Sequence, residues 1–287
     1  MRNRIVACAA LAICVANITN TAENVFVTNL LLGRTGAHLG CYLKAKAVAA
    51  YLDVPFVLTP FPYSKEFKLH TADPLWAKRH EGKKIVIRTK KQLEKIKSDL
   101  DKLPTKQVTY QVHGCLRINN GQLLSKEEKD RLLTPIKEID GPHPPVGHAS
   151  VAVHVRTGGG FDSKHDIATQ PERFPGINYY AKQIQHLADT HPDKKLWCFI
   201  FTDHPTPETI VDTLAKLINA PNISMECRKK NRHNINIIED IILMSRCRYL
   251  IKAKSSYSGM AAIIGKHEAV LDLKSGAFLN EPWRPGK

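Results

Sequence analysis

Short apolar runs alternate with helical patterns along this chain, on both sides of one proline-rich stretch. In the first half, an apolar run at 25–32 is followed by a glycine turn, a helical pattern that ends near Tyr51 and a second apolar run at 54–58. This order of strand, turn, helix and strand is typical of a βαβ unit. The further elements predicted in this half are a helix at 90–103, a strand at 108–112 and a helix at 126–139.

A second series of the same kind follows the stretch Gly141–Pro145. Prolines at this density cannot continue a helix and favour an extended connection. The elements predicted after it are strands at 151–155, 196–202, 223–226 and 249–252 and helices at 179–190, 207–219, 235–247 and from 259 onward. Alternating elements predict mostly parallel sheets with helices on both faces. We therefore expect an α/β protein with two Rossmann-like domains, at 23–145 and 146–287, facing across a cleft.

The composition is that of a basic globular protein. Of its 287 residues, 43% are hydrophobic and 24% are charged, which excludes a disordered chain. The formal net charge of +15 suits an anionic small molecule, an acidic membrane surface or a nucleic acid, and does not choose among them. A basic binding protein for an anionic polymer is therefore one hypothesis for its function.

The first 22 residues have the pattern of a secretory leader. Arg2 and Arg4 precede an apolar stretch at 5–16, and Ala16 and Ala22 offer small residues for cleavage. The stretch is short for a membrane-spanning helix. We expect a signal peptide, and with it a location in the secretory lumen or an exported, membrane-associated state. The alternative is a buried first element of the fold in a cytoplasmic protein.

Several common kinds of site are not supported by the sequence. No Cys-x-x-Cys pair exists and the histidines are irregularly spaced, so we expect no metal site. The phosphate-binding loop G-x-x-x-x-G-K-[ST] and the nucleophile elbow G-x-S-x-G are also missing.

The segment 151–162, VAVHVRTGGGFD, points to an anion-binding loop. Its apolar start reads as a buried strand that carries His154 and Arg156 to its carboxyl end. Glycines follow at 158–160, where the backbone can approach a ligand closely because no Cβ intervenes. A fixed cation beside such a loop, at the end of a parallel strand, is suited to a diphosphate.

The other loops at this predicted edge add groups that suit a nucleotide. Asp203 ends one strand, and Ser255 and Ser256 open a helix whose first N–H groups could bind phosphate. Asp240, on the preceding helix, could accept hydrogen bonds from the ring N–H and amino group of guanine. The structural alternatives are an exposed helix position for Asp240 and a simple helix cap for Ser255.

These motifs together resemble the fucosyltransferase superfamily, which includes the α-1,2-, α-1,6- and protein O-fucosyltransferases. The resemblance rests on His154-Val-Arg156, on FIFTD at 199–203, on the run from Asp240 to Ile251 and on SSYS at 255–258. The turn GRTG at 33–36 resembles the family's amino-terminal G-R-x-G-N-Q. The resemblance implies a GT-B fold, a GDP-fucose donor, an inverting displacement and no metal or other cofactor.

The resemblance also implies roles for single residues. Arg156 would be the catalytic residue, which holds the β-phosphate and stabilises the charge on the departing GDP. His154 and Asp240 would contact the guanosine, and Ser256 the phosphates. The other residues expected to bind the donor are Gly158, Gly159, Asp203 and Ser255, and those expected in the turn on the acceptor side are Gly33, Arg34, Gly36 and His38.

The chain departs from the family pattern at two places. Thr157 and Gly158 stand where the family often has a second arginine and its neighbour, and Ala37-His38 replaces an Asn-Gln pair. The acceptor, a glycan or a glycoprotein, and the sugar itself therefore remain open. The candidates for a general base are Asp162, Asp166 and His38. We expect no nucleic-acid partner under this hypothesis, and peripheral contact with a membrane is compatible with it.

Overall fold

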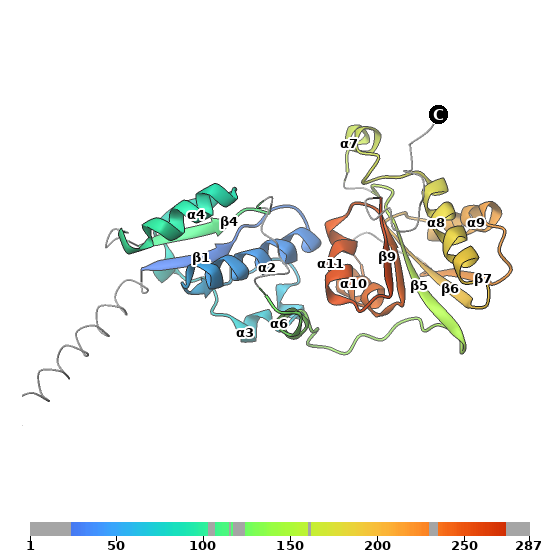
Figure 1. Cartoon of the computed structure of the whole chain (residues 1–287), viewed down its shortest axis with the longest axis horizontal. Helices are drawn as coiled ribbons and strands as arrows, with labels where there is room; N and C mark the ends of the chain where they lie inside the picture. The colour runs from blue at the N-terminus through green and yellow to red at the C-terminus, as the bar shows by residue number, and fades with distance from the viewer. Residues whose placement is uncertain are drawn as a thin grey trace, which may run out of the picture. The chain divides into compact units, whose positions relative to one another are not determined.

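The computed structural model describes residues 24–102, 107–114, 116, 124–159, 162–229 and 235–273. The predicted leader and Gly160 lie outside the described residues. The chain divides into two compact units, Met1–Ile136 and Lys137–Lys287 (Figure 1). The proline-rich stretch Gly141–Pro145 lies near the start of the second unit.

The first unit is built on a four-stranded parallel sheet. Its order is β2-β1-β4-β3, with β1 at Val25–Asn29, β2 at Phe56–Val57, β3 at Lys83–Ile87 and β4 at Val108–Val112. The long helix α2 (Thr35–Leu52) packs on this sheet through buried side chains such as Leu39 and Val48. The other helices of four or more residues are α3 (Leu69–Ala72), α4 (Lys90–Asp99) and α6 (Lys126–Leu132).

The second unit contains a five-stranded parallel sheet of order β7-β6-β5-β8-β9. Its strands are β5 (His148–Val155), β6 (Lys195–Thr202), β7 (Ile223–Cys227), β8 (Tyr249–Lys252) and β9 (Ala269–Leu271). The chain starts at β5, adds two strands on one side and then crosses to add two on the other. This reversal between β5 and β8 is where open α/β sheets bind their ligands.

Five helices accompany the second sheet. Figure 1 shows α8 and α9 together on one side of it and α10 and α11 together on the other. The strands read as continuous apolar runs because both faces are covered, and Val151, Val153 and Ile200 are almost fully buried. The helices are α7 (Lys164–Thr169), α8 (Ile177–Thr190), α9 (Pro207–Leu217), α10 (Ile237–Arg246) and α11 (Ser256–Ile264).

Two elements differ from the predictions for physical reasons. The helix predicted at 126–139 ends at Leu132, because Pro135 has no N–H to donate and its ring disfavours a helical conformation at the residue before it. Strand β3 has no matching prediction, since it opens with Lys83 and Lys84 and lies exposed at the sheet edge. An exposed edge strand lacks the apolar pattern of a buried one.

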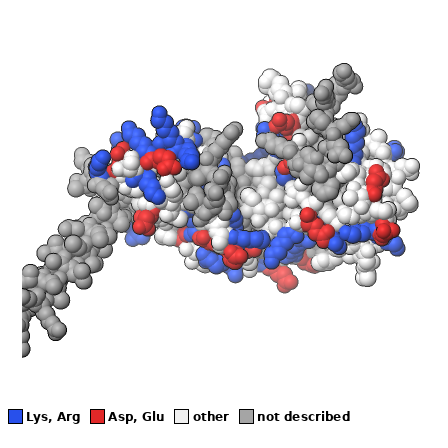
Figure 2. Space-filling model, in the orientation of Figure 1, with Lys and Arg blue, Asp and Glu red and all other residues white. Residues whose placement is uncertain are grey.

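The basic surface is unevenly distributed. Figure 2 shows Lys and Arg side chains gathered over α4 of the first unit. The exposed lysines of this helix are Lys90, Lys91, Lys95 and Lys97. Within the described ranges, no helix has both the length and the apolar character needed to cross a membrane.

Candidate functional site

The predicted donor-binding residues converge at the carboxyl ends of β5 and β8. Arg156 directly follows β5, and Ser255 lies between β8 and α11, at the reversal of the strand order. Their side chains meet although 99 positions separate them, with Nη1 of Arg156 3.5 Å from Oγ of Ser255. His154, Arg156, Asp240 and Ser255 are each at most 9% exposed. Such a group of buried polar side chains is uncommon unless hydrogen bonds or a ligand satisfy it.

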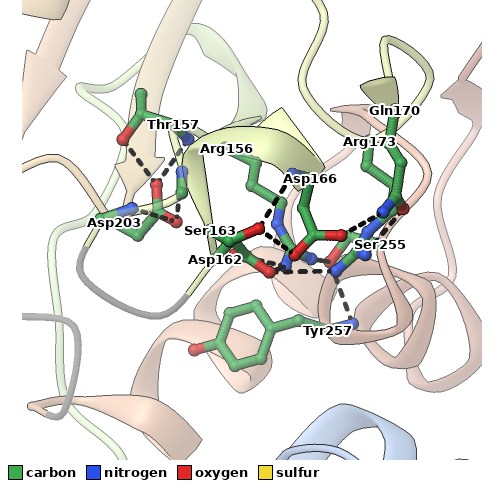
Figure 3. A network of polar contacts seen from close by, with 12 residues as sticks. Arg156, Thr157, Asp162, Ser163, Asp166, Gln170, Arg173, Asp203, Ser255 and Tyr257 are labelled. Carbon is green, nitrogen blue, oxygen red and sulfur yellow. Dashed lines mark hydrogen bonds and ion pairs between the residues drawn. The ribbon is translucent and has the colours of Figure 1, made fainter. Parts of the chain in front are cut away.

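The guanidinium of Arg156 is fixed by several contacts. Nη2 donates to both carboxylate oxygens of Asp162, at 2.9 and 2.7 Å (Figure 3). The guanidinium also lies over the ring of Phe174, 4.9 Å from its centroid. The backbone N–H of Arg156 donates to the hydroxyl of Tyr180. Nε of Arg156 is buried and has no hydrogen-bond partner. A buried donor left in this way is available to a ligand.

Ser255 caps helix α11. Its Oγ accepts a hydrogen bond from the N–H of Tyr257 at 3.2 Å, which is the usual role of an N-cap serine. No acidic side chain lies in the first turn of the helix. The positive end of the helix and the Arg156 guanidinium therefore lie side by side, which favours an anion at this place.

Asp203 organises the glycine loop after β5. Its carboxylate accepts four hydrogen bonds: from N and Oγ1 of Thr157, at 2.6 and 2.9 Å, and from the N–H groups of Gly158 and Gly159, at 3.1 and 3.2 Å (Figure 3). The loop is also tight at Gly158, whose φ is +86°, a value that favours glycine. In this arrangement Asp203 positions the loop, a role that differs from the direct donor contact predicted for it.

His154 lies inside the sheet beside α11. Its ring is 5.5 Å from that of Tyr257, and its Nδ1 is buried without a partner. Burial is the main cause that lowers the pKa of His154 to about 4; Arg156 and Lys252 act in the same direction and Asp203 against it. The imidazole is therefore neutral at neutral pH and can serve as a hydrogen-bonding group rather than as a cation.

Asp240 forms a buried ion pair on α10. Nη2 of Arg228 donates to its Oδ1 at 2.6 Å. Burial raises the pKa of Asp240 to about 6, although the contact with Arg228 acts in the opposite direction. The carboxylate is therefore charged above about pH 6, in the form that can accept hydrogen bonds from a guanine edge.

A cavity of about 310 Å³ opens beside Ser255 and Ser256, at the carboxyl ends of β8 and β9. Its volume lies at the lower end of the range for small-molecule sites, about 300–1,000 Å³. Two of its lysines are paired with carboxylates, Lys252 with Asp272 and Lys254 with Glu172. The lining residues are Glu172, Lys252, Lys254, Ser255, Ser256, Asp272 and Leu273. Ser256, the exposed first residue of α11, thus faces open space.

We expect His154 and Asp240 to give opposite dependences of stability on pH. His154 binds a proton less readily in the folded state, so its contribution is complete above pH 6.5 and is lost as the pH falls towards 4. Asp240 binds a proton more readily in the folded state, so its protonation below pH 6 favours folding. Each contribution to the free energy of folding is on the order of a few kcal/mol.

Denaturant unfolding at pH 7 and at pH 4 measures both contributions. Relative to the wild type, His154→Gln should gain stability on acidification, because the unfavourable histidine contribution is removed. Asp240→Asn should lose stability on acidification for the converse reason. If the two variants and the wild type change in parallel between these pH values, neither group has the shifted pKa described above.

The predicted acceptor-side residues lie together in the first unit, after β1. Gly33 has a φ of +76°, as a glycine turn requires, and Arg34 is the N-cap residue of α2. Gly36 was expected in the turn but lies in the first turn of the helix, which begins at Thr35. His38 is buried, packs 5.4 Å from the ring of Phe61 and has no partner for Nδ1.

The three candidates for a general base have different surroundings. The carboxylate of Asp162 accepts hydrogen bonds from Arg156 and Arg173. A hydrogen bond from Ser163 is the main cause that lowers the pKa of half-buried Asp166, which makes this carboxylate a weaker base. Burial lowers the pKa of His38, so its imidazole is neutral at neutral pH. His38 therefore has the chemical form of a base.

Several residues of this site have no counterpart in the sequence predictions. Three of them come from loops, one from α8 and one from α11, and their side chains contact the predicted residues. They are Arg173, Phe174, Tyr180, Arg228 and Tyr257. The arginine and phenylalanine at 173–174 follow α7 within the long connection after β5. A cationic residue next to an aromatic one is the sequence signal that could have identified them. Among the residues that the structure describes, no three His, Cys, Asp or Glu side chains are grouped to hold a metal ion.

Comparisons with known proteins support the architecture. No family model and no curated protein matches the sequence. POFUT1 in complex with GDP-fucose matches the fold with a TM-score of 0.56 at 11% identity, over 88% of this chain and 98% of that one. POFUT1 in complex with GDP matches with a TM-score of 0.54 at 12% identity, over 87% and 98% of the chains. NodZ α-1,6-fucosyltransferase soaked with GDP-fucose has a TM-score of 0.48 at 14% identity, over 88% and 96%.

The two POFUT1 structures and the two parallel sheets confirm the predicted fold class. The chain has an α/β fold with two Rossmann-like units, and this fold is that of GT-B fucosyltransferases.

Proposed function

We propose that this protein is an inverting, metal-independent glycosyltransferase that transfers fucose or a related sugar from a GDP-sugar to a hydroxyl group of a glycan or protein. One observation carries the proposal: Arg156 and the N-terminus of α11 lie together at the reversal of the strand order in the second sheet. This places a fixed cation beside the positive end of a helix, an arrangement that suits a diphosphate. The POFUT1 structures of similar fold hold GDP-fucose or GDP, which supports the same ligand class here.

The nucleoside end of the donor would lie towards Asp240. Its carboxylate can accept the N–H groups of a guanine, whereas uracil presents a different set of donors and acceptors. The neutral imidazole of His154 can donate or accept a hydrogen bond to the ribose or base without carrying charge. Selectivity for GDP over UDP is therefore expected, since a carboxylate left unpaired by the wrong base is costly.

The reaction would proceed by in-line displacement at the anomeric carbon. The acceptor oxygen forms the new bond as the bond from the anomeric carbon to the β-phosphate oxygen breaks, and GDP leaves with the electron pair. Arg156 and the first N–H groups of α11 would stabilise the charge that develops on GDP. The proton of the acceptor hydroxyl would pass to a base, for which Asp162, Asp166 and His38 are the candidates.

Replacement of His38 by Gln should separate chemistry from donor binding. We expect the transfer rate to fall by about 10²–10⁴, the usual contribution of a general base. The affinity for GDP should stay within twofold, because the role tested for His38 is proton transfer. Single-turnover rates and calorimetric GDP titrations measure the two quantities. A wild-type rate in His38→Gln would remove it from the mechanism.

The leader would direct the protein to the secretory lumen, where its acceptors would be glycans or glycoproteins. Sequencing the amino terminus of protein purified from a secreting host tests this part. A mature chain that begins shortly after Ala16 or Ala22 supports it, and an intact leader on soluble cytoplasmic protein contradicts it.

A transfer assay tests the proposed activity as a whole. The full chain is incubated with GDP-fucose, EDTA and a panel of oligosaccharide and glycopeptide acceptors, and released GDP is measured. GDP release that depends on one acceptor class and persists in EDTA supports the proposal. Dependence on added metal would contradict the metal-independent part, and release with UDP-sugars alone would contradict the donor assignment.

A further inference from the structure

Two arginines of the second unit converge on one carboxylate. Nη2 of Arg156 donates to both oxygens of Asp162, and Nη2 of Arg173 donates to Oδ1 at 3.2 Å (Figure 3). The side chain of Asp162 is 9% exposed, that of Arg156 is 9% exposed and that of Arg173 is 31% exposed. Asp162 is therefore enclosed between a buried and a more accessible guanidinium.

Both guanidinium groups are held in place by further contacts. They lie over the same ring, with the Arg156 and Arg173 carbons 4.9 and 5.3 Å from the centroid of Phe174. Nη1 of Arg173 donates to Oε1 of Gln170 at 2.8 Å, and the amide of Gln170 donates in turn to Asp166 at 2.8 Å. Stacking and hydrogen bonding of this kind fix the plane of an arginine before a ligand arrives.

Two guanidinium groups share the carboxylate of Asp162, and the carboxylate of Asp166, which also acts on Arg173, is a further negative charge of this group. Arginine binds carboxylate and phosphate oxygens with the same geometry. Thr157, the residue next to Arg156, adds no positive charge to the two arginines. Its N–H and hydroxyl both donate to Asp203.

We propose that Asp162 occupies the place of a phosphate group and that Arg173 is a second arginine for the donor diphosphate. This inference rests on the proposed function and deepens it. Arg173 supplies the cation that position 157 lacks. The diphosphate binds Arg156 and Arg173 by displacing the Asp162 carboxylate, so Asp162 competes with the donor and weakens its binding.

Two variants separate these roles. Asp162→Asn keeps the shape of the side chain and removes its charge, and we expect it to tighten GDP binding about tenfold. Arg173→Ala should weaken GDP binding by tenfold or more, because charge-assisted hydrogen bonds to phosphate are lost. Arg173→Lys should bind more weakly than the wild type but better than Arg173→Ala. Thermal unfolding identifies any variant that fails to fold.

Two matched control variants each remove one charge of the same sign as a cluster variant does, but outside the cluster. Arg248→Ala removes an arginine that is paired with Glu268 at the start of β8, and Asp193→Asn removes an exposed aspartate before β6. Both should keep the wild-type affinity for GDP. If they shift the affinity as much as the cluster variants do, the effect belongs to net charge and the proposal falls.

Titrations with GDP, pyrophosphate and guanosine distinguish this inference from the proposed function. The expected result is that Asp162→Asn tightens and Arg173→Ala weakens binding of GDP and pyrophosphate, with guanosine unaffected. Unchanged GDP affinity in both folded variants would overturn the inference and leave the function standing. The same pattern with pyrophosphate alone, without GDP selectivity, would support the anion site and contradict the function. No binding of either anion to Asp162→Asn would overturn both.

Discussion

Arg156→Ala should lower the rate of sugar transfer by about 10²–10³, the usual effect of removing one preorganised group that stabilises developing charge. The guanidinium is buried, stacked on Phe174 and directed to the N-terminus of α11. Arg156→Lys keeps the charge but loses the planar fork, and should recover only part of the rate. Steady-state release of GDP from GDP-fucose measures the transfer rate of the wild type and of both variants.

The control for this variant concerns Asp162. Removing Arg156 deprives the Asp162 carboxylate of its closest partner and leaves it paired with Arg173, which should lower the stability of the fold. The double variant Arg156→Ala/Asp162→Asn removes both charges and should fold better than Arg156→Ala while staying inactive. A double variant with wild-type turnover would show that Arg156 has no part in the chemistry.

Gly159→Ala should disrupt the loop that follows β5. A Cβ at this position would lie 1.8 Å from the backbone carbonyl oxygen of Asp203, so the loop or the strand end must move. Such overpacking against backbone typically costs about 1–3 kcal/mol of folding free energy. The movement would also break the hydrogen bond from the Gly159 N–H to Asp203. We expect GDP affinity to fall by tenfold or more.

A second glycine supplies the matched control. Gly259 lies in helix α11, and a Cβ there would meet no atom within 4 Å. Gly259→Ala should therefore raise stability by about 0.5–1 kcal/mol, as alanine favours the helix. Urea unfolding and calorimetric GDP titration compare the two variants. If Gly159→Ala binds GDP as the wild type does, the loop geometry after β5 is unimportant for the donor.

The strand ends of this site could be predicted from the sequence because sheet topology alone brings them together. The apolar runs before Arg156 and Ser255 identify two parallel strands, and the carboxyl ends of parallel strands meet at one edge of the sheet. The meeting of these residues at 3.5 Å follows from that arrangement. The cap role of Ser255 was likewise among the alternatives that its position allowed.

The contacts made by loops could not be predicted in this way. Arg173 reaches Asp162 because the connection through α7 folds back on the strand end, and no periodic pattern encodes that path. The carboxylate of Asp203, which is predicted to bind the donor, also accepts hydrogen bonds from the backbone of the glycine loop. The pairing of Arg228 with Asp240 depends on how side chains pack between β7 and α10. Such contacts depend on tertiary packing rather than on local sequence.

The most direct test of the nucleotide site is a calorimetric titration of the full chain, without metal, with GDP, GDP-fucose, GDP-mannose and UDP-sugars. We expect micromolar binding of GDP and GDP-fucose and no measurable binding of UDP-sugars, because in the proposed function Asp240 would select the guanine and Arg156 would hold the diphosphate. Absence of binding to every nucleotide, together with salt-dependent binding to heparin or RNA, would contradict the transferase proposal and favour a basic protein that binds anionic polymers.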